Sequence, residues 1–306
     1  AALPEREAMV TADSLWAEFA AGRTDFARVV AAAGQLARHR ERLPGIELAG
    51  KLAALANTTL ADAELPAYRA LMQLLYGARP EMQGFDPATP VADSHTQGWR
   101  ESLVPLLALQ ARDPALRAAL RTAATRLLDG DAAALAPVYR RTALAVAVQD
   151  GGVPVIDRLF AALKASSDPL FRAQAAAALG SAEGAAAVTR VQGLAMGEGL
   201  ISRERTTILG ALTFNRGARD ATTSYVASNF RTVVESFPGF ARAGVIGFFD
   251  GYCSSDAIAR VEGLIRPNLA ILGGGELELA QTMERIGQCA ALKAAKGAEI
   301  SAVLAR

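Results

Sequence analysis

Catalytic side chains are scarce in this sequence. Its 306 residues include only two histidines and two cysteines. A histidine-based triad or zinc site would have to use His39 or His95 at an unusual position. The motifs H-E-x-x-H, C-x-x-C, G-x-S-x-G and G-x-x-x-x-G-K-S/T are also absent. Taken alone, the residues therefore favour a helical scaffold over a self-sufficient enzyme.

The two cysteines, Cys253 and Cys289, are too few for a disulfide framework, and their spacing fits no zinc pattern. Each lies in an apolar segment with helical periodicity. We expect a pair of buried structural thiols. One disulfide is the alternative, if the two residues lie close together in the fold.

Aromatic residues make up only 6% of the chain, and Ala and Leu dominate. This composition favours close-packed helices over a β-sandwich or barrel, which would need more Val, Ile, Thr and Tyr. No run of about 18 uncharged apolar residues occurs, so we expect no membrane span. Gly273-Gly274-Gly275 resembles a phosphate loop only superficially, because no strand precedes it, and we interpret it as a connector.

Neither basic nor acidic residues are in clear excess. The 32 basic and 31 acidic residues leave a net charge of +1. This balance gives no indication of a nucleic-acid partner. The densest basic run is Arg38-His39-Arg40-Glu41-Arg42. It lacks interleaved aromatic residues, and we interpret it as the solvated end of a helix.

Helical signals, in contrast, are abundant, and the clearest lie in residues 150–180. Gly151-Gly152 breaks the chain, and an apolar stripe at helical spacing follows. Asp168 and Pro169 then form a cap and first turn for a second helix, which Gly180 ends as a C′ residue. The same start recurs at Asp113-Pro114, and both copies have Arg four residues after the Asp (Arg117 and Arg172). Because one short pair cannot bury its own apolar face, we expect such pairs to stack.

The pattern continues along the chain, with no convincing period-2 alternation. We therefore predict an all-α fold, an irregular α-solenoid of HEAT-like antiparallel helix pairs. The predicted helices lie near residues 3–21, 25–39, 46–57, 62–76, 99–111, 114–128, 135–149, 153–165, 169–179, 184–196, 203–214, 220–235, 240–250, 255–266, 275–289 and 290–305. Expected caps or turns include Thr24 or Asp25, Pro44-Gly45 and Ser202.

We predict one helical domain over residues 1–306, with a possible break between lobes in the irregular segment 77–98. His95 lies in that segment and is interpreted as a surface residue. The sequence does not begin with Met and its N-terminus has no signal pattern, so we expect it to be a cut within a longer chain. A cytoplasmic and a periplasmic location both fit the sequence.

Several motifs follow one another in an order and spacing that point to a known family. They are Arg6 to Leu15, Asp150-Gly151-Gly152, Asp157-Arg158-Leu159-Phe160, Asp168-Pro169-Leu170-Phe171-Arg172, Ala178-Leu179-Gly180, Gly199-Leu200-Ile201 with Arg203, Asn215 to Arg219, Asn229-Phe230, Phe237-Pro238, Phe248-Phe249, Cys253, Gln281 to Ile286 and Cys289. Together they resemble the C-terminal helical domain of aminopeptidase N-like zinc metallopeptidases, of the puromycin-sensitive and endoplasmic-reticulum type. The resemblance spans nearly the whole chain.

The resemblance implies a bowl of HEAT-like helix pairs that covers a preceding thermolysin-like catalytic domain. That domain would carry the zinc motif, which this chain lacks, so we expect no cofactor here. The implied partners are the upstream catalytic domain of the same chain and peptide substrates. The implied role is to enclose the active site, limit access, exclude water and orient the peptide.

The resemblance also suggests substrate-binding residues, while no residue of this chain is expected to be catalytic. A peptide carboxylate would need cations on the concave face, and the candidates are Arg203, Arg205, Arg216 and Arg219. The family has Gly-Arg-Asn at this turn. This chain has Thr213-Phe214-Asn215-Arg216 instead, so the Arg is displaced.

Two other functions compete with this one. A free-standing HEAT-like scaffold would bind a protein partner on its concave face, and a start codon near Ala1 would favour it over an upstream catalytic domain. An independent enzyme using His39 or His95 is the third hypothesis. Replacing both histidines by Ala without loss of activity would exclude it.

Overall fold

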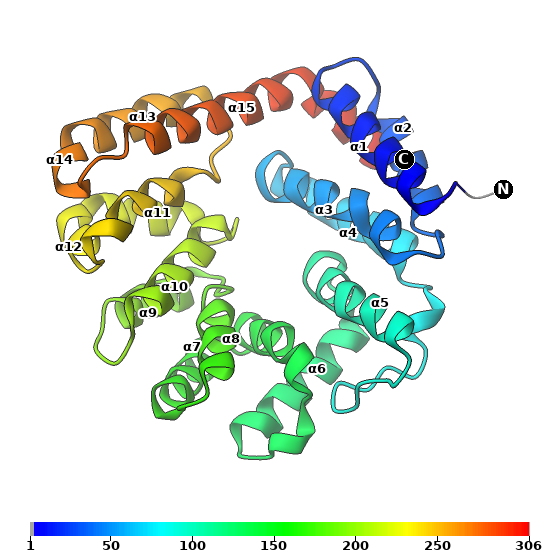
Figure 1. The fold of residues 1–306 in the computed structure, drawn as a ribbon, viewed down its shortest axis with the longest axis horizontal. Coiled ribbons are helices and arrows are strands. Elements are labelled where there is room, and N and C mark those ends of the chain that lie inside the picture. Colours follow the sequence, from blue (N-terminus) through cyan, green and yellow to red (C-terminus); the bar gives the residue numbers. More distant parts are fainter. Residues whose placement is uncertain (1–2, 306) are drawn as a thin grey trace. The chain divides into compact units, whose positions relative to one another are not determined.

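The computed structural model describes residues 3–305, which fold into helices joined by turns and loops, with no strand among them (Figure 1). The predicted all-α, solenoid-like fold class is confirmed. The α-helices are α1 (Glu5–Ala20), α2 (Phe26–Leu36), α3 (Arg42–Thr58), α4 (Leu65–Tyr76), α5 (Ser94–Pro105), α6 (Pro114–Leu128), α7 (Arg140–Ala165), α8 (Pro169–Leu179), α9 (Ala185–Ala195), α10 (Ser202–Phe214), α11 (Arg219–Ser228), α12 (Phe230–Glu235), α13 (Ser255–Ile265), α14 (Leu269–Leu272) and α15 (Glu276–Leu304).

Shorter or differently wound helical segments connect them. The π-helix η3 (Leu106–Ala111) continues from α5. The 3₁₀ segments are η1 (Asp62–Glu64), η2 (Pro80–Met82), η4 (Ala132–Ala134), η5 (Pro137–Tyr139), η6 (Gly239–Phe249) and η7 (Arg266–Asn268). Within residues 3–305, no helix has both the length and the apolar character needed to cross a membrane.

The chain divides into two compact units. Unit 1 comprises Ala1–Arg117 and Ala291–Arg306, and unit 2 comprises Ala118–Ala290. The chain passes from one unit to the other within α6 and again within α15. The irregular segment near 77–98 lies inside unit 1. Its end differs from the prediction, because α5 begins at Ser94 and places His95 in an exposed first helical turn.

Unit 2 is built from helices packed in two rows. In one row α8 packs on α10 and α10 on η6, and in the other α7 packs on α9 and α9 on α11 (Figure 1). Helix α8 also packs against α7, and these two helices form the predicted central pair. Leu159, Leu163 and Leu179 are fully buried there, so their predicted place in the core is confirmed.

Unit 1 packs around large buried side chains. Phe19, Phe26, Met72, Tyr76 and Trp99 are buried at the contacts of its helices. The end of α15 returns to this unit. There Lys296 donates to the carbonyl of Thr24 (2.9 Å), and Glu299 accepts from the backbone N–H of Phe26. The last helix therefore supplies an acceptor for the first turn of α2.

Several predicted local signals are confirmed. Gly152 has φ 59° and ψ −148°, which divides α7 into two helical halves at the predicted break. Asp168 accepts from the N–H of Leu170 (2.9 Å), and Asp25 accepts from that of Arg28 (2.7 Å). Of the two residues proposed to cap α2, Asp25 is the one that does so.

Gly180 ends α8 as predicted, but for a different reason. Its φ of −67° is right-handed, so it is not a left-handed C′ residue. A Cβ at this position would lie 2.2 Å from the Cβ of Ala211 on α10. Glycine is therefore needed for the close approach of the two helices.

The predicted turn at Pro44-Gly45 is wrong. Helix α3 begins at Arg42, and Pro44 lies in its first turn, where the missing N–H leaves no helical bond unmade. Gly45 is needed because a Cβ there would lie 2.2 Å from Cη2 of Trp99.

Two further boundaries differ from the predictions. The expected helix 220–235 is divided at Asn229 into α11 and α12. The expected pair 275–289 and 290–305 is the single helix α15. No Gly or Pro occurs from Gln288 to Leu292, so nothing in the chain breaks the helix there.

Candidate functional site

Four arginines share one position and one kind of contact. Each is the fourth residue of its helix, and its guanidinium donates to a carbonyl at or near the end of the preceding helix or turn. The bonds join Arg117 to Ala108 (2.8 Å), Arg172 to Leu163 (2.8 Å), Arg205 to Ala195 (2.8 Å) and Arg242 to Phe237 (3.2 Å). Because the last carbonyls of a helix lack partners within it, these arginines fasten successive helices together.

Two of the arginines predicted to bind substrate, Arg203 and Arg205, lie in the first turn of α10 and have different surroundings. Arg203 is exposed, and its guanidinium makes no hydrogen bond or ion pair with any residue that the structure describes. Arg205 donates to three carbonyls, those of Ala195, Ser236 (3.1 Å) and Gly197 (3.3 Å). Arg205 therefore holds the neighbouring turns, while Arg203 faces solvent.

The start of α10 is capped differently from the prediction. Ser202 is the first helical residue, and Ile201 precedes it as the N-cap. The carboxylate of Glu204 accepts from the N–H of Ile201 (3.1 Å). Sequence analysis missed Glu204, which is only 5% exposed. Its position three residues after the N-cap was the signal that could have identified it.

The other two predicted arginines lie beyond the opposite end of α10. Arg219 begins α11, is 9% exposed and donates from Nε to the carbonyl of Thr213 (3.1 Å). Burial lowers the pKa of its guanidinium, and the nearby charge of Arg216 lowers it further, while Asp220 opposes both effects. Arg216 is half-buried in the turn between the helices. These two arginines therefore lie close enough to interact.

A glycine and an amide hold this turn in place. A Cβ on Gly251 would lie 2.7 Å from Nε of Arg219, so only glycine leaves room for the guanidinium. The side chain of Asn215 donates to the carbonyl of Ala182 (2.8 Å) and accepts from the N–H of Gly217 (3.1 Å). The turn that carries Arg216 is thereby fixed to the end of α8.

The four predicted arginines do not converge on one point. Arg203 and Arg205 lie at the start of α10, and Arg216 and Arg219 lie beyond its end. Helix α10 has 13 residues, which corresponds to a length of about 20 Å. The structure thus brings together Arg216 and Arg219 but separates them from the first-turn pair.

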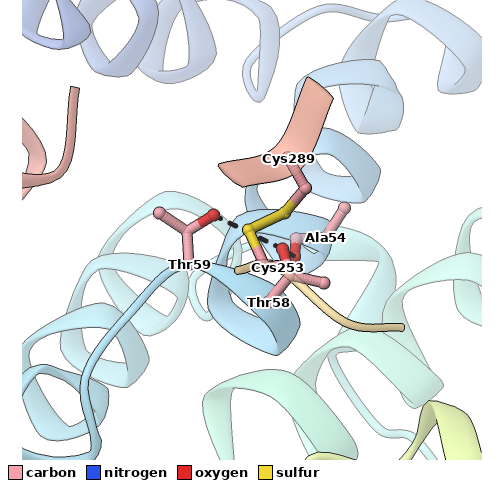
Figure 2. Close-up of a disulfide and its surroundings, with 5 residues drawn as sticks. All are labelled: Ala54, Thr58, Thr59, Cys253 and Cys289. Atoms are coloured by element: carbon pink, nitrogen blue, oxygen red, sulfur yellow. Dashed lines mark hydrogen bonds between the residues drawn. A yellow bond between two sulfur atoms is a disulfide. The ribbon is translucent and has the colours of Figure 1, made fainter. Parts of the chain in front are cut away.

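The cysteines differ from the favoured expectation of two free thiols. Cys253 and Cys289 form a disulfide, with their Cα atoms 5.0 Å apart (Figure 2). It joins the turn before α13 to α15 within unit 2. Nearby, Asp250 accepts from the hydroxyl of Thr282 (2.6 Å) and pairs with Arg285 (3.0 Å). These contacts fix the same turn to α15.

The histidines are placed as structural or surface residues. His39 is 9% exposed. Its Nδ1 accepts from the N–H of Glu41 (3.0 Å), so that Nε2 can donate to the carbonyl of Leu3 (2.9 Å). Among residues 3–305, no three His, Cys, Asp or Glu side chains lie close enough together to hold a metal ion.

The comparison with known families found a family model that covers most of the chain. Residues 1–288 match the family model described as ERAP1-like C-terminal domain. The chain belongs to this family. The resemblance found in the sequence is thus confirmed, and the ERAP1-like domain is the C-terminal domain of an aminopeptidase. Its match ends within α15. No curated protein matches the chain.

Proposed function

We propose that this ERAP1-like domain is a non-catalytic domain that encloses the active site of a zinc aminopeptidase and helps admit and orient peptides. The observation that carries the proposal is the family match over residues 1–288. In this proposal the zinc ion, the general-base Glu and the site for the free amine belong to a catalytic domain of the same chain. The helical domain would form a HEAT-like enclosure around them.

The four candidate arginines divide into two proposed roles. Arg203, which is exposed, and Arg216, which is half-buried, are the proposed contacts for a peptide carboxylate. Arg205 and Arg219 bond to backbone carbonyls. We propose that they position the chain around the substrate site and contribute positive charge to it.

The test is an activity assay of the chain alone and in combination. With added zinc, the chain is assayed against a panel of amino-acid arylamides, then mixed with the separately expressed catalytic domain and assayed again on peptides of graded length. We expect no activity from the chain alone and a changed peptide-length preference in the mixture. Activity from the chain alone, or a mixture that behaves like the catalytic domain by itself, would overturn the proposal.

A further inference from the structure

An open groove lies between α7 and α9 in unit 2. It has a volume of about 490 Å³, within the usual range for small-ligand sites. Its apolar lining consists of Phe160, Ala161 and Ala165, and its charged lining consists of Asp157, Lys164 and Arg190. The groove therefore offers apolar surface beside two cations and one anion.

Lys164 lines this groove without an anionic partner. Its ammonium makes no hydrogen bond or ion pair with a residue in the described part of the chain, and Nζ lies 5.8 Å from the centre of the Phe160 ring. Gly199 lies against its stem, because a Cβ there would be 2.7 Å from Cε of Lys164. With a φ of 90°, Gly199 also has a backbone conformation that other residues rarely adopt. Lys164 is exposed, so its stem rests on Gly199 while its ammonium is open to solvent.

Arg190 is oriented in a way that leaves part of its guanidinium available. Nε donates to Oδ1 of Asp157 (2.7 Å), and the two Nη groups make no hydrogen bond with the residues described here. Roughly half of each side chain is exposed, 48% for Arg190 and 44% for Asp157. Asp157 offsets one of the two positive charges, so the groove keeps a net charge of +1.

A carboxylate suits this arrangement. The two Nη groups of an arginine present parallel donors to the two oxygens of a carboxylate, and a lysine ammonium adds a further donor. An apolar or aromatic group attached to the carboxylate would cover Phe160 and the two alanines. We propose that the α7–α9 groove binds a carboxylate that carries an adjacent apolar group. This site uses none of the arginines of the proposed function and does not depend on that function.

The carboxylate could come from a small organic acid or from an acidic side chain in a peptide, and matched probes separate these sources. Hippurate is compared with its neutral amide, hippuramide. Acetyl-Phe-Glu-amide, which has no free chain end, is compared with acetyl-Phe-Gln-amide. Binding to the whole chain is followed by NMR titration of the α7 and α9 amides and by calorimetry.

We expect at least one acid to bind saturably and about tenfold more tightly than its neutral partner, with shifts confined to the groove. The acid that binds more tightly identifies the source. Equal binding of each acid and its amide, or no saturation by any probe up to about 10 mM, would overturn the proposal.

Variants test the two cations separately. Lys164→Met keeps the apolar stem and removes the charge, and Arg190→Gln removes the paired donors. Each should weaken binding of the acid about tenfold. The matched control is Arg158→Gln, since Arg158 lies on the same helix but pairs with Asp129 (2.6 Å) outside the groove. Full affinity in both groove variants, or equal loss in the control, would show that the cations do not form the site.

Discussion

The guanidinium of Arg172 and the carboxylate of Glu204 are joined by two hydrogen bonds, Nε to Oε1 at 2.6 Å and Nη2 to Oε2 at 2.8 Å. The Glu204 side chain is 6% exposed and that of Arg172 is 19% exposed. The hydrogen bonds to Glu204 raise the pKa of Arg172 above its usual value. This pair connects the first turns of α8 and α10.

Removing Arg172 should therefore destabilise unit 2 strongly. Arg172→Met leaves the Glu204 carboxylate buried without its partner, and we expect a loss of about 3 kcal/mol in the free energy of unfolding. Urea denaturation measures it. The control is Arg231→Met, because Arg231 pairs with Glu235 on an exposed surface and should cost less than about 1 kcal/mol. Equal losses in the two variants would contradict the assignment.

The Cys253–Cys289 disulfide should contribute measurable stability. The two residues are 36 positions apart, and a crosslink of this span reduces the entropy of the unfolded chain. Replacing both cysteines by Ser should cost about 2–4 kcal/mol. Thermal melting with and without a reductant checks this, since the wild type should become less stable on reduction and the double variant should not respond. Identical melting of the wild type in both conditions would argue against the bond.

The hydrogen bond from the N–H of Phe26 to Glu299, near the end of α15, should weaken in acid. Two hydrogen bonds lower the pKa of Glu299. The one from Lys296 has the larger effect, and the one from the backbone N–H of Phe26 has a smaller effect. The stability that this carboxylate contributes is therefore fully present above the ordinary glutamate pKa of about 4.3 and is lost as the pH falls through the lower folded-state value.

Hydrogen exchange of the first turn of α2 across this pH range tests the effect of Glu299. Protection should fall with pH in the wild type and depend less on pH in Glu299→Gln. Glu278→Gln, at an exposed position on the same helix, serves as the control and should behave like the wild type. The same pH dependence in all three proteins would refute this role for Glu299.

Replacing Arg203 should change the kinetics on long peptides without changing the stability of the chain. Its guanidinium is exposed and unpaired among residues 3–305, so Arg203→Ala should leave the melting temperature unchanged. If the proposed function is correct, the reconstituted enzyme should show a KM for long peptides raised about tenfold and unchanged arylamide turnover. Arg231→Ala is the control. Unchanged peptide kinetics would remove Arg203 from the proposed substrate contacts.

Leu179→Asp should unfold the central helix pair. Leu179 is 0% exposed, and a buried carboxylate without a partner costs several kcal/mol. We expect a loss of more than about 4 kcal/mol, seen in thermal melting. Leu170→Asp on the same helix is the control, because Leu170 is 53% exposed. A melting temperature close to that of the wild type would mean that the site tolerates the charge.

Much of the local structure could be predicted because its signals are local. Asp168 and Pro169 are adjacent, and the predicted cap and first turn follow from that spacing. The partner of Arg172 could not be predicted in the same way. Glu204 is 32 residues away, and only the packing of α8 on α10 brings it within reach.

The pairing of the cysteines and the roles of the predicted arginines also depend on helix packing, which local sequence does not determine. Whether Cys253 and Cys289 pair depends on where the turn before α13 meets α15, which spacing alone does not determine. The candidates Arg203, Arg205, Arg216 and Arg219 were chosen by charge and resemblance. Which of them bonds to a carbonyl and which is exposed depends on the packing of α10 against its neighbours.

The backward bonds of the first-turn arginines also restrict how this chain can change in length. Arg117 and Arg172 each donate to a carbonyl nine residues earlier. The length of the side chain leaves no room for an added residue in the turn between the two helices that each arginine joins. Insertions at those junctions should be rare in related chains, because one extra residue would break the bond from the guanidinium to that carbonyl. Longer connections should instead occur where no such arginine follows, such as the turn between α6 and η4.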